Sequence, residues 1–138
     1  MLHARNTALL ASVRAHEGYR LHAYRDSVGV LTIGYGYNVE NGMPRPLAEL
    51  VMRWYVEQAL EFLATYSTWF PRLSENRQRA LTEMIYQLGA NRFVRFVRML
   101  RALEAGDFDQ AAAEMMTSKW AEQTPTRAMH CAQLMREG

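Results

Sequence analysis

The sequence predicts an α+β fold that is mostly helical and carries a small antiparallel β-hairpin lobe flanking an active-site cleft. Apolar residues recur at helical spacing over residues 7–16 and again from residue 46 onward. Two short β-prone segments, residues 21–24 and 30–33, lie between these helical stretches. Because a small sheet beside a helical body leaves a cleft between two lobes, we expect the ligand to bind there.

Length and composition predict one globular domain. The 138 residues include 49% hydrophobic and 22% charged residues, so we expect a single domain over residues 1–138. Its β lobe is placed at about 19–42 and its helical body at about 46–138. The single cysteine, Cys131, excludes an internal disulfide. No apolar run approaches the ~18 residues of a membrane span, and the amino terminus lacks the apolar stretch of a secretory signal. These features predict a protein made in a cytosol.

The β lobe is predicted from the residues that end its elements. Gly18 is the glycine expected to end the first helix, which covers residues 7–16. The two β-prone segments form a hairpin around residues 25–29. After a further turn, Val39 is expected to extend a third short strand.

The helical body is predicted to hold five or so helices. Pro46 suits the first turn of a long helix that ends before Pro71. Apolar residues from Phe93 to Leu103 predict one continuous helix. Ser74 is expected to cap a helix that ends at Gly89, and Gly106 to end the helix that contains Phe93 to Leu103. Asp107 and Gln110 are expected to form a capping box for a helix over residues 108–116. Thr124 and Pro125 are expected to begin a last helix through Arg136.

The basic residues are almost all arginine and are unevenly placed. The net charge is +2, yet 15 of the 16 basic residues are arginine and Lys119 is the only lysine. Genomic base composition explains this bias, and contact with a polyanion is the alternative. The segment from Arg72 to Arg101 contains seven arginines but only two glutamates. The stripe that recurs every three residues on one expected helix consists of Arg92, Arg95, Arg98 and Arg101.

Two carboxyl groups and one hydroxyl form the candidate catalytic set. Glu17 lies at the carboxyl end of the first helix, where the negative end of the helix dipole favours a protonated carboxyl group. Asp26 falls in the hairpin turn, where a solvated carboxylate is expected to be ionised. Two carboxyl groups in contrasting environments suit glycoside hydrolysis, and Thr32 on the return strand can aim its hydroxyl at a water between them. From the residues alone, an ordinary helix end and an ordinary turn are the commoner explanations.

Two blocks of the sequence resemble the phage-type lysozymes, glycoside hydrolase family 24, and together cover most of the chain. The first block consists of Glu17-Gly18, Tyr24-Arg25-Asp26-Ser27-Val28-Gly29 and Leu31-Thr32-Ile33-Gly34-Tyr35-Gly36. The second consists of Tyr86-Gln87-Leu88-Gly89, Phe93, Arg98-Met99-Leu100, Ser118-Lys119-Trp120 and Gln123-Thr124-Pro125-Thr126-Arg127.

The resemblance implies a lysozyme-like fold and a muramidase. Such an enzyme hydrolyses the β-1,4 bond between N-acetylmuramic acid and N-acetylglucosamine in peptidoglycan, with inversion at the anomeric carbon. By this resemblance, Glu17 is the general acid, and Asp26 and Thr32 hold the attacking water.

The resemblance also implies substrate-binding residues and the absence of a metal. Asn38, Tyr86 and Tyr37 are expected to contact the saccharide. Tyr37 replaces a histidine common among relatives, so we expect a hydroxyl hydrogen bond in place of any ion pair. The resemblance implies neither a metal nor an organic cofactor. The histidines also show no paired metal-ligand spacing; they are His3, His16, His22 and His130.

Three supporting residues are expected in the helical body. The same resemblance implies that Arg127 pairs with Glu17, and that Gln87 and Trp120 pack and hydrogen-bond beneath the cleft. For Glu83, one helical turn before Gln87, a solvated helix face is favoured over a position near the cleft.

These expectations describe an endolysin, a monomer that binds neither nucleic acid nor a membrane stably. It would accumulate in the host cytoplasm and act on the cell wall or periplasm after a holin permeabilises the membrane. The arginine stripe would be a solvated face, or would attract anionic cell-wall polymer or lipopolysaccharide. One alternative is a virion- or tail-associated lysozyme-like module that binds peptidoglycan with little or no turnover. Another is a small nucleic-acid-binding helical protein that uses the arginines between residues 72 and 101.

Overall fold

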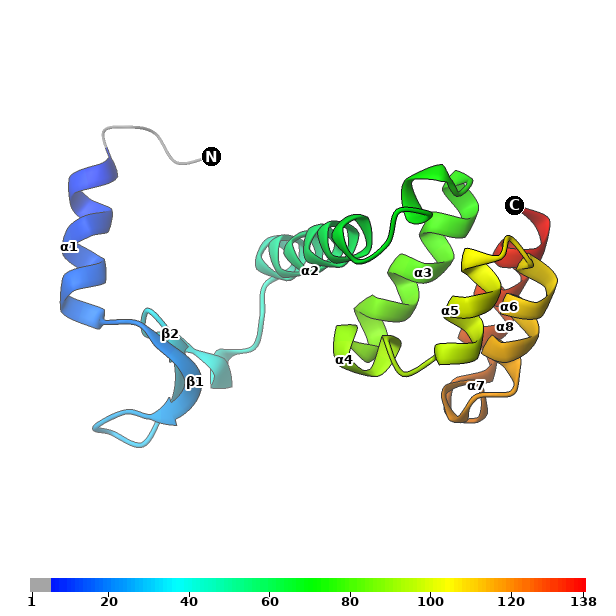
Figure 1. Cartoon of the computed structure of the whole chain (residues 1–138). Helices are drawn as coiled ribbons and strands as arrows, with labels where there is room; N and C mark the ends of the chain where they lie inside the picture. Colours follow the sequence, from blue (N-terminus) through cyan, green and yellow to red (C-terminus); the bar gives the residue numbers. More distant parts are fainter. Residues whose placement is uncertain (1–5) are drawn as a thin grey trace. The chain divides into compact units, whose positions relative to one another are not determined.

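The computed structural model describes residues 6–138, and the chain divides into two compact units, Met1–Glu49 and Leu50–Gly138 (Figure 1). The first unit contains helix α1 and a three-stranded sheet, whereas the described part of the second is helical. Helix α2 (Arg45–Tyr66) begins in the first unit and continues in the second. The fold is therefore α+β and mostly helical, as the sequence predicts.

The first unit is built around a small antiparallel sheet with strand order β1-β2-β3. Helix α1 spans Thr7–Glu17 and ends at Gly18, whose φ of 69° is the left-handed conformation that glycine adopts without strain. The strands are β1 (Arg20–Arg25), β2 (Leu31–Gly34) and β3 (Tyr37–Asn38). The predicted helix and hairpin are both confirmed.

The prediction that Val39 extends a third strand is wrong. The third strand ends at Asn38, and Val39 begins the 3-10 helix η2 (Val39–Asn41). The cause is a local cap, because the Asn38 side-chain oxygen accepts a hydrogen bond from the Glu40 amide at 2.9 Å.

The second unit packs its helices around one apolar core. Helix α8 packs on α3, α6 and α7, and α5 packs on α6. Its side chains with relative exposure below 2% include Phe93, Leu63 and Met84. No helix in residues 6–138 is long and apolar enough to span a membrane. The elements after α2 are η3 (Phe70–Arg72), α3 (Glu75–Leu88), α4 (Ala90–Phe93), α5 (Val97–Glu104), α6 (Phe108–Met116), α7 (Lys119–Gln123) and α8 (Pro125–Glu137).

Two predicted helix caps of this unit are confirmed. The Ser74 hydroxyl accepts a hydrogen bond from the amide of Arg77 at 3.3 Å, and Asp107 accepts one from the amide of Gln110 at 3.0 Å. The capping box is only half formed, because the Gln110 side chain donates to Glu114 at 2.9 Å instead of returning to the cap.

Two other predictions for this unit are wrong. The single helix expected from Phe93 to Leu103 is two helices, α4 and α5, separated by residues 94–96 (Figure 1). The break places the Phe96 ring edge-to-face with Trp120, with ring centroids 6.4 Å apart. Thr124 does not cap α8 through its side chain, because its hydroxyl donates to the Trp120 carbonyl at 2.9 Å.

The helix break also corrects the arginine stripe. Arg92 lies on α4, Arg95 lies between the two helices, and Arg98 lies on α5 with Arg101. The four arginines therefore do not form a stripe on one helix.

Candidate active site

The hairpin holds the Asp26 carboxylate in a fixed orientation. Its Oδ1 accepts hydrogen bonds from the amides of Val28 at 3.0 Å and Val30 at 2.9 Å. The Asp26 amide in turn donates to the Val30 carbonyl at 3.0 Å. Because both amides bind the same oxygen, Oδ2 is the oxygen left for a water molecule or a proton.

Thr32 lies on the central strand and is tied to the same backbone residue as Asp26. It pairs with Tyr24 on β1 and with Asn38 on β3, and its relative exposure is 4%. Its hydroxyl donates to the Val30 carbonyl at 2.9 Å. Since that bond uses the only proton of the hydroxyl, Thr32 can meet a water only as an acceptor. Val30 thus fixes both side chains predicted to hold the water.

Glu17 lies against the turn that joins β2 and β3. An ideal Cβ built at Gly36 would lie 2.5 Å from Glu17 Oε2 and 3.0 Å from its Cδ. Only glycine leaves room for the carboxyl group in this position, and the φ of Gly36, 80°, also favours glycine. The first unit therefore contains all three predicted catalytic residues, with Glu17 supplied by α1 and placed against the β2–β3 turn.

An ion pair that the sequence does not predict braces the loop that follows Asp26. Arg25 Nη1 donates to the Gly29 carbonyl at 2.9 Å and to Glu40 Oε1 at 3.2 Å. The same Glu40 oxygen accepts a hydrogen bond from the Leu31 amide at 3.3 Å. These contacts join the two ends of the Asp26 loop to η2. No sequence signal identifies the pair, because its members are 15 positions apart and outside any helical register.

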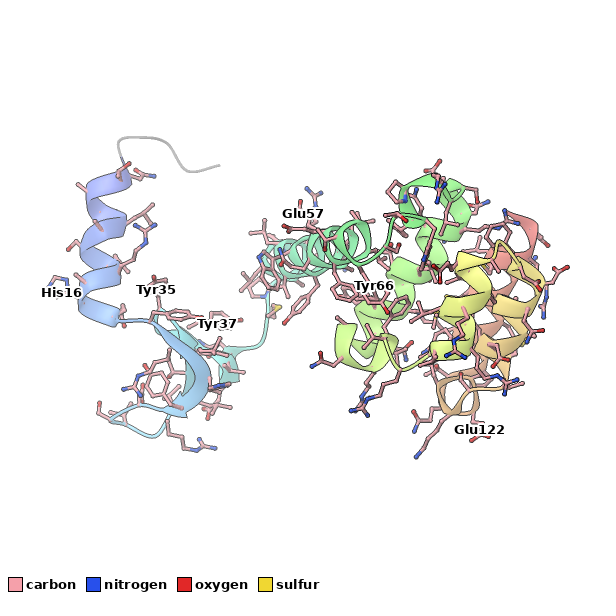
Figure 2. The ribbon with its side chains drawn as sticks, viewed as in Figure 1. His16, Tyr35, Tyr37, Glu57, Tyr66 and Glu122 are labelled. Carbon is pink, nitrogen blue, oxygen red and sulfur yellow. The ribbon has the colours of Figure 1, made fainter. Side chains whose placement is uncertain are left out.

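The predicted saccharide-contacting residues of the first unit are both anchored within it. The Tyr37 hydroxyl donates to the Gly42 carbonyl, so the hydrogen bond expected in place of the relatives' histidine is made to backbone. Asn38 uses its side-chain oxygen to cap η2, which directs its amide hydrogens to other partners. Figure 2 shows Tyr35 and Tyr37 projecting from the turn and strand beside α1. The Tyr35 ring lies 5.6 Å, centroid to centroid, from that of Tyr19, and both side chains are exposed.

The second unit contains the other predicted site residues. Trp120 Nε1 donates to Gln87 Oε1 at 2.9 Å, so the expected hydrogen bond between these two residues is present. Their position beneath a cleft stays a prediction. Tyr86 is 42% exposed, and its ring packs edge-to-face on Tyr55, with ring centroids 6.4 Å apart.

Glu83 is surrounded by basic side chains instead of lying on a freely solvated helix face. Its carboxylate is 3.1 Å from Arg79 Nε, 3.9 Å from Arg127 Nε and 3.7 Å from His130 Nε2. Burial raises the pKa of the neighbouring Cys131 thiol to about 11, with the Glu83 charge adding to the effect. The ion pair expected between Arg127 and Glu17 would join the two units and stays a prediction.

The described side chains offer no cluster for a metal ion. Within residues 6–138, the structure shows no group of three or more histidine, cysteine, aspartate or glutamate side chains that could bind one. His16 instead bonds through Nδ1 to the Ser12 carbonyl at 2.8 Å. His3 lies outside the described residues. Independently of any metal, the carboxyl groups of Glu17 and Asp26 in the first unit can act as an acid and a base.

Comparisons of the sequence with known proteins identify one family and several relatives. A sequence model described as phage lysozyme matches residues 14–134. The chain is similar to probable T4-type lysozyme 2 of Dictyostelium discoideum, with 24% identity covering 96% of the chain and 95% of that protein. It is similar to an endolysin of Acyrthosiphon pisum secondary endosymbiont phage 1, with 29% identity covering 82% and 77%. It also resembles the pre-baseplate central spike protein Gp5 of Enterobacteria phage T4, with 26% identity covering 96% of the chain but 28% of that protein.

Proposed function

The chain belongs to the phage lysozyme family, and we propose that it is a muramidase that hydrolyses the β-1,4 bond between N-acetylmuramic acid and N-acetylglucosamine in peptidoglycan. The observation that carries the proposal is the joint anchoring of Asp26 and Thr32 on Val30. That anchoring leaves a carboxylate oxygen and a hydroxyl lone pair, the two acceptors that an attacking water requires.

The first half of the proposed reaction is activation of water. The water donates one hydrogen to Asp26 Oδ2 and the other to Thr32 Oγ1. Its oxygen attacks the anomeric carbon of N-acetylmuramic acid while its proton passes to Asp26. Because Oδ1 is held by two amides, the carboxylate does not need to reorient during this transfer.

The second half is departure of the leaving group. As the bond from the anomeric carbon to the glycosidic oxygen breaks, the Glu17 carboxylic acid gives its proton to that oxygen, which becomes the free 4-hydroxyl of N-acetylglucosamine. The attacking water enters on the opposite face, so the configuration inverts and no covalent intermediate forms. Proton exchange with solvent returns Glu17 to the acid form and Asp26 to the carboxylate.

The biological role follows as part of the same proposal. An endolysin made in the host cytoplasm meets peptidoglycan only after a holin permeabilises the membrane, and cell lysis results. We propose that it acts as a monomer without a cofactor. A virion-associated module is the second candidate, favoured by the similarity to the Gp5 spike protein. Release of lytic activity from cells only after the membrane is permeabilised supports the endolysin role, whereas recovery of the chain in purified virions supports the second candidate.

Substitution of the proposed acid tests the enzyme assignment. Glu17→Gln keeps the shape of the side chain but removes its transferable proton, so it should abolish clearing of permeabilised cells without changing the melting temperature. Glu57→Gln, an exposed site on α2 (Figure 2), is the matched control and should clear like the wild type. Wild-type clearing by Glu17→Gln would remove Glu17 from the acid role. Wild-type protein that pellets with cell walls but leaves them intact would support a binding module.

A further inference from the structure

The second unit contains a pocket of about 650 Å³ that is lined in part by basic side chains. Phe96 and Trp120 are among the apolar side chains that line it, together with Leu88 and Met99. The cations that line it come from α4, from the α4–α5 connection, from α5 and from α7. We call this site the basic pocket and define it by Arg92, Arg95, Arg98 and Lys119.

The helix break makes this arrangement possible. On one continuous helix the arginines would point outward in a stripe, as the sequence predicts. The break at residues 94–96 instead places Arg92, Arg95 and Arg98 around one concavity, to which α7 adds Lys119. Arg101, the next member of the series, does not line this pocket.

The charges of the basic pocket are poorly balanced. Its single lining carboxylate, Glu114, is 3.2 Å from Arg98 Nε and also accepts a hydrogen bond from Gln110. Within residues 6–138, the structure shows no carboxylate paired with Arg92, Arg95 or Lys119. Cations that converge on one concavity repel each other and attract a compact, multiply charged anion.

We propose that the basic pocket binds a phosphate group carried by a phosphorylated glycan of the bacterial cell envelope. Phosphate fits better than a single carboxylate, because it carries up to two charges on three oxygens, and guanidinium groups bind such oxygens in pairs. Apolar side chains such as Phe96 line the same pocket and give the adjoining sugar a surface on which to pack. A concave site suits one discrete group, whereas duplex nucleic acid presents an extended row of phosphates. The choice of an envelope polymer rests on the proposed function; the phosphate chemistry does not.

Calorimetric titration of the full chain with inorganic pyrophosphate tests the site. We expect saturable binding that weakens with salt, and an increase in Kd of about tenfold or more for Arg95→Ala and for Lys119→Ala. Arg101→Ala is the matched control, because it removes the same charge outside the basic pocket and should leave Kd unchanged. Glu114→Gln should tighten binding, since it removes the opposing charge. The proposal fails if pyrophosphate does not bind, if Arg101→Ala weakens binding as much as Arg95→Ala, or if citrate binds as tightly as pyrophosphate.

Two polymers identify the source of the phosphate. Sedimentation with lipopolysaccharide micelles and with wall teichoic acid should show binding to at least one of them, and that binding should be lost in Arg95→Ala. If Arg95→Ala abolishes binding to just one of the two polymers, that polymer is the ligand. Binding of a short DNA duplex that depends on Arg95, with no binding to either envelope polymer, would overturn the proposal in favour of nucleic acid.

Hydrolysis measured separately keeps this proposal distinct from the proposed function. On purified peptidoglycan freed of phosphate-bearing polymers, Arg95→Ala should retain wild-type kcat, because the basic pocket takes no part in the chemical steps. If the wild type fails to hydrolyse this substrate yet still binds pyrophosphate through Arg95, the muramidase proposal fails and the phosphate site stands. If Arg95→Ala loses kcat on this substrate while its pyrophosphate affinity is unchanged, the phosphate site is refuted.

Discussion

Gly36→Ala should separate the position of the Glu17 carboxyl group from the stability of the fold. The new methyl carbon would lie 2.5 Å from Glu17 Oε2, whereas ordinary contacts begin at 3.4 Å. The carboxyl group therefore has to retreat by about 1 Å, because it is the mobile end of its side chain and the methyl group is fixed to backbone. We expect kcat to fall roughly 100-fold, the loss typical of such a displacement of a reacting group.

The same substitution also strains the backbone. An alanine at a φ of 80° costs about 1–2 kcal/mol of folding free energy. Gly42→Ala is the matched control, since Gly42 has a φ of 77° and no atom within 4 Å of its ideal Cβ. Both variants should lose similar stability, but only Gly36→Ala should lose activity.

Initial rates of clearing of permeabilised cells, measured well below both melting temperatures, provide the comparison. Wild-type clearing by Gly36→Ala would show that Glu17 does not need its place against the β2–β3 turn. Equal losses of activity in the two variants would attribute the effect to backbone strain and refute the positional argument.

The remaining predictions concern the loop brace, the Tyr37 hydroxyl and the buried thiol. Glu40→Ala should lower kcat roughly tenfold with KM unchanged, because the Asp26 loop loses its brace. The free energy of unfolding should change by less than about 1 kcal/mol, because the Arg25–Glu40 pair is exposed. Glu40→Gln keeps an acceptor oxygen and should restore most of the rate, and failure to do so refutes the bracing role. Tyr37→Phe removes one hydrogen bond to Gly42 and should cost about 1 kcal/mol in denaturant unfolding without lowering kcat, so a large loss of turnover would reveal a catalytic role for the hydroxyl. The pKa of Cys131 is raised to about 11 in the folded chain, so the unfolded state loses this proton first and stability should fall between pH 9 and pH 11. Denaturant unfolding of Cys131→Ala should show a shallower fall over that range, and an equal fall would contradict the assignment.

Local signals in the sequence were sufficient for much of the fold. Gly18 ends α1, and Ser74 caps α3, because a positive φ and a cap depend on residues only a few positions apart. The failures have non-local or competing causes. Residues 94–96 leave the helix where Phe96 meets Trp120, a contact between the α4–α5 connection and α7 that helical periodicity does not contain. The Thr124 side chain does not cap α8, because its hydroxyl donates a hydrogen bond to the Trp120 carbonyl instead.

The candidate site also contains residues that the sequence predicts and residues that it does not. The resemblance to phage-type lysozymes predicts Glu17, Asp26 and Thr32 as the catalytic set, because the intervals between them lie within one short segment, and this assignment stays a prediction. The Arg25–Glu40 pair is not predictable from the sequence, because a charge pair between a strand and a 3-10 helix leaves no periodic signal. The basic pocket has a different cause, because it depends on the helix break at residues 94–96, which helical periodicity does not predict.

Analysis of the fragments released from purified peptidoglycan tests the central proposal most directly. A muramidase leaves N-acetylmuramic acid at the new reducing end, with one water added per bond broken, and Glu17→Gln should release none of these fragments. Reducing N-acetylglucosamine, an anhydro sugar formed without added water, or a cut between glycan and peptide would contradict the account.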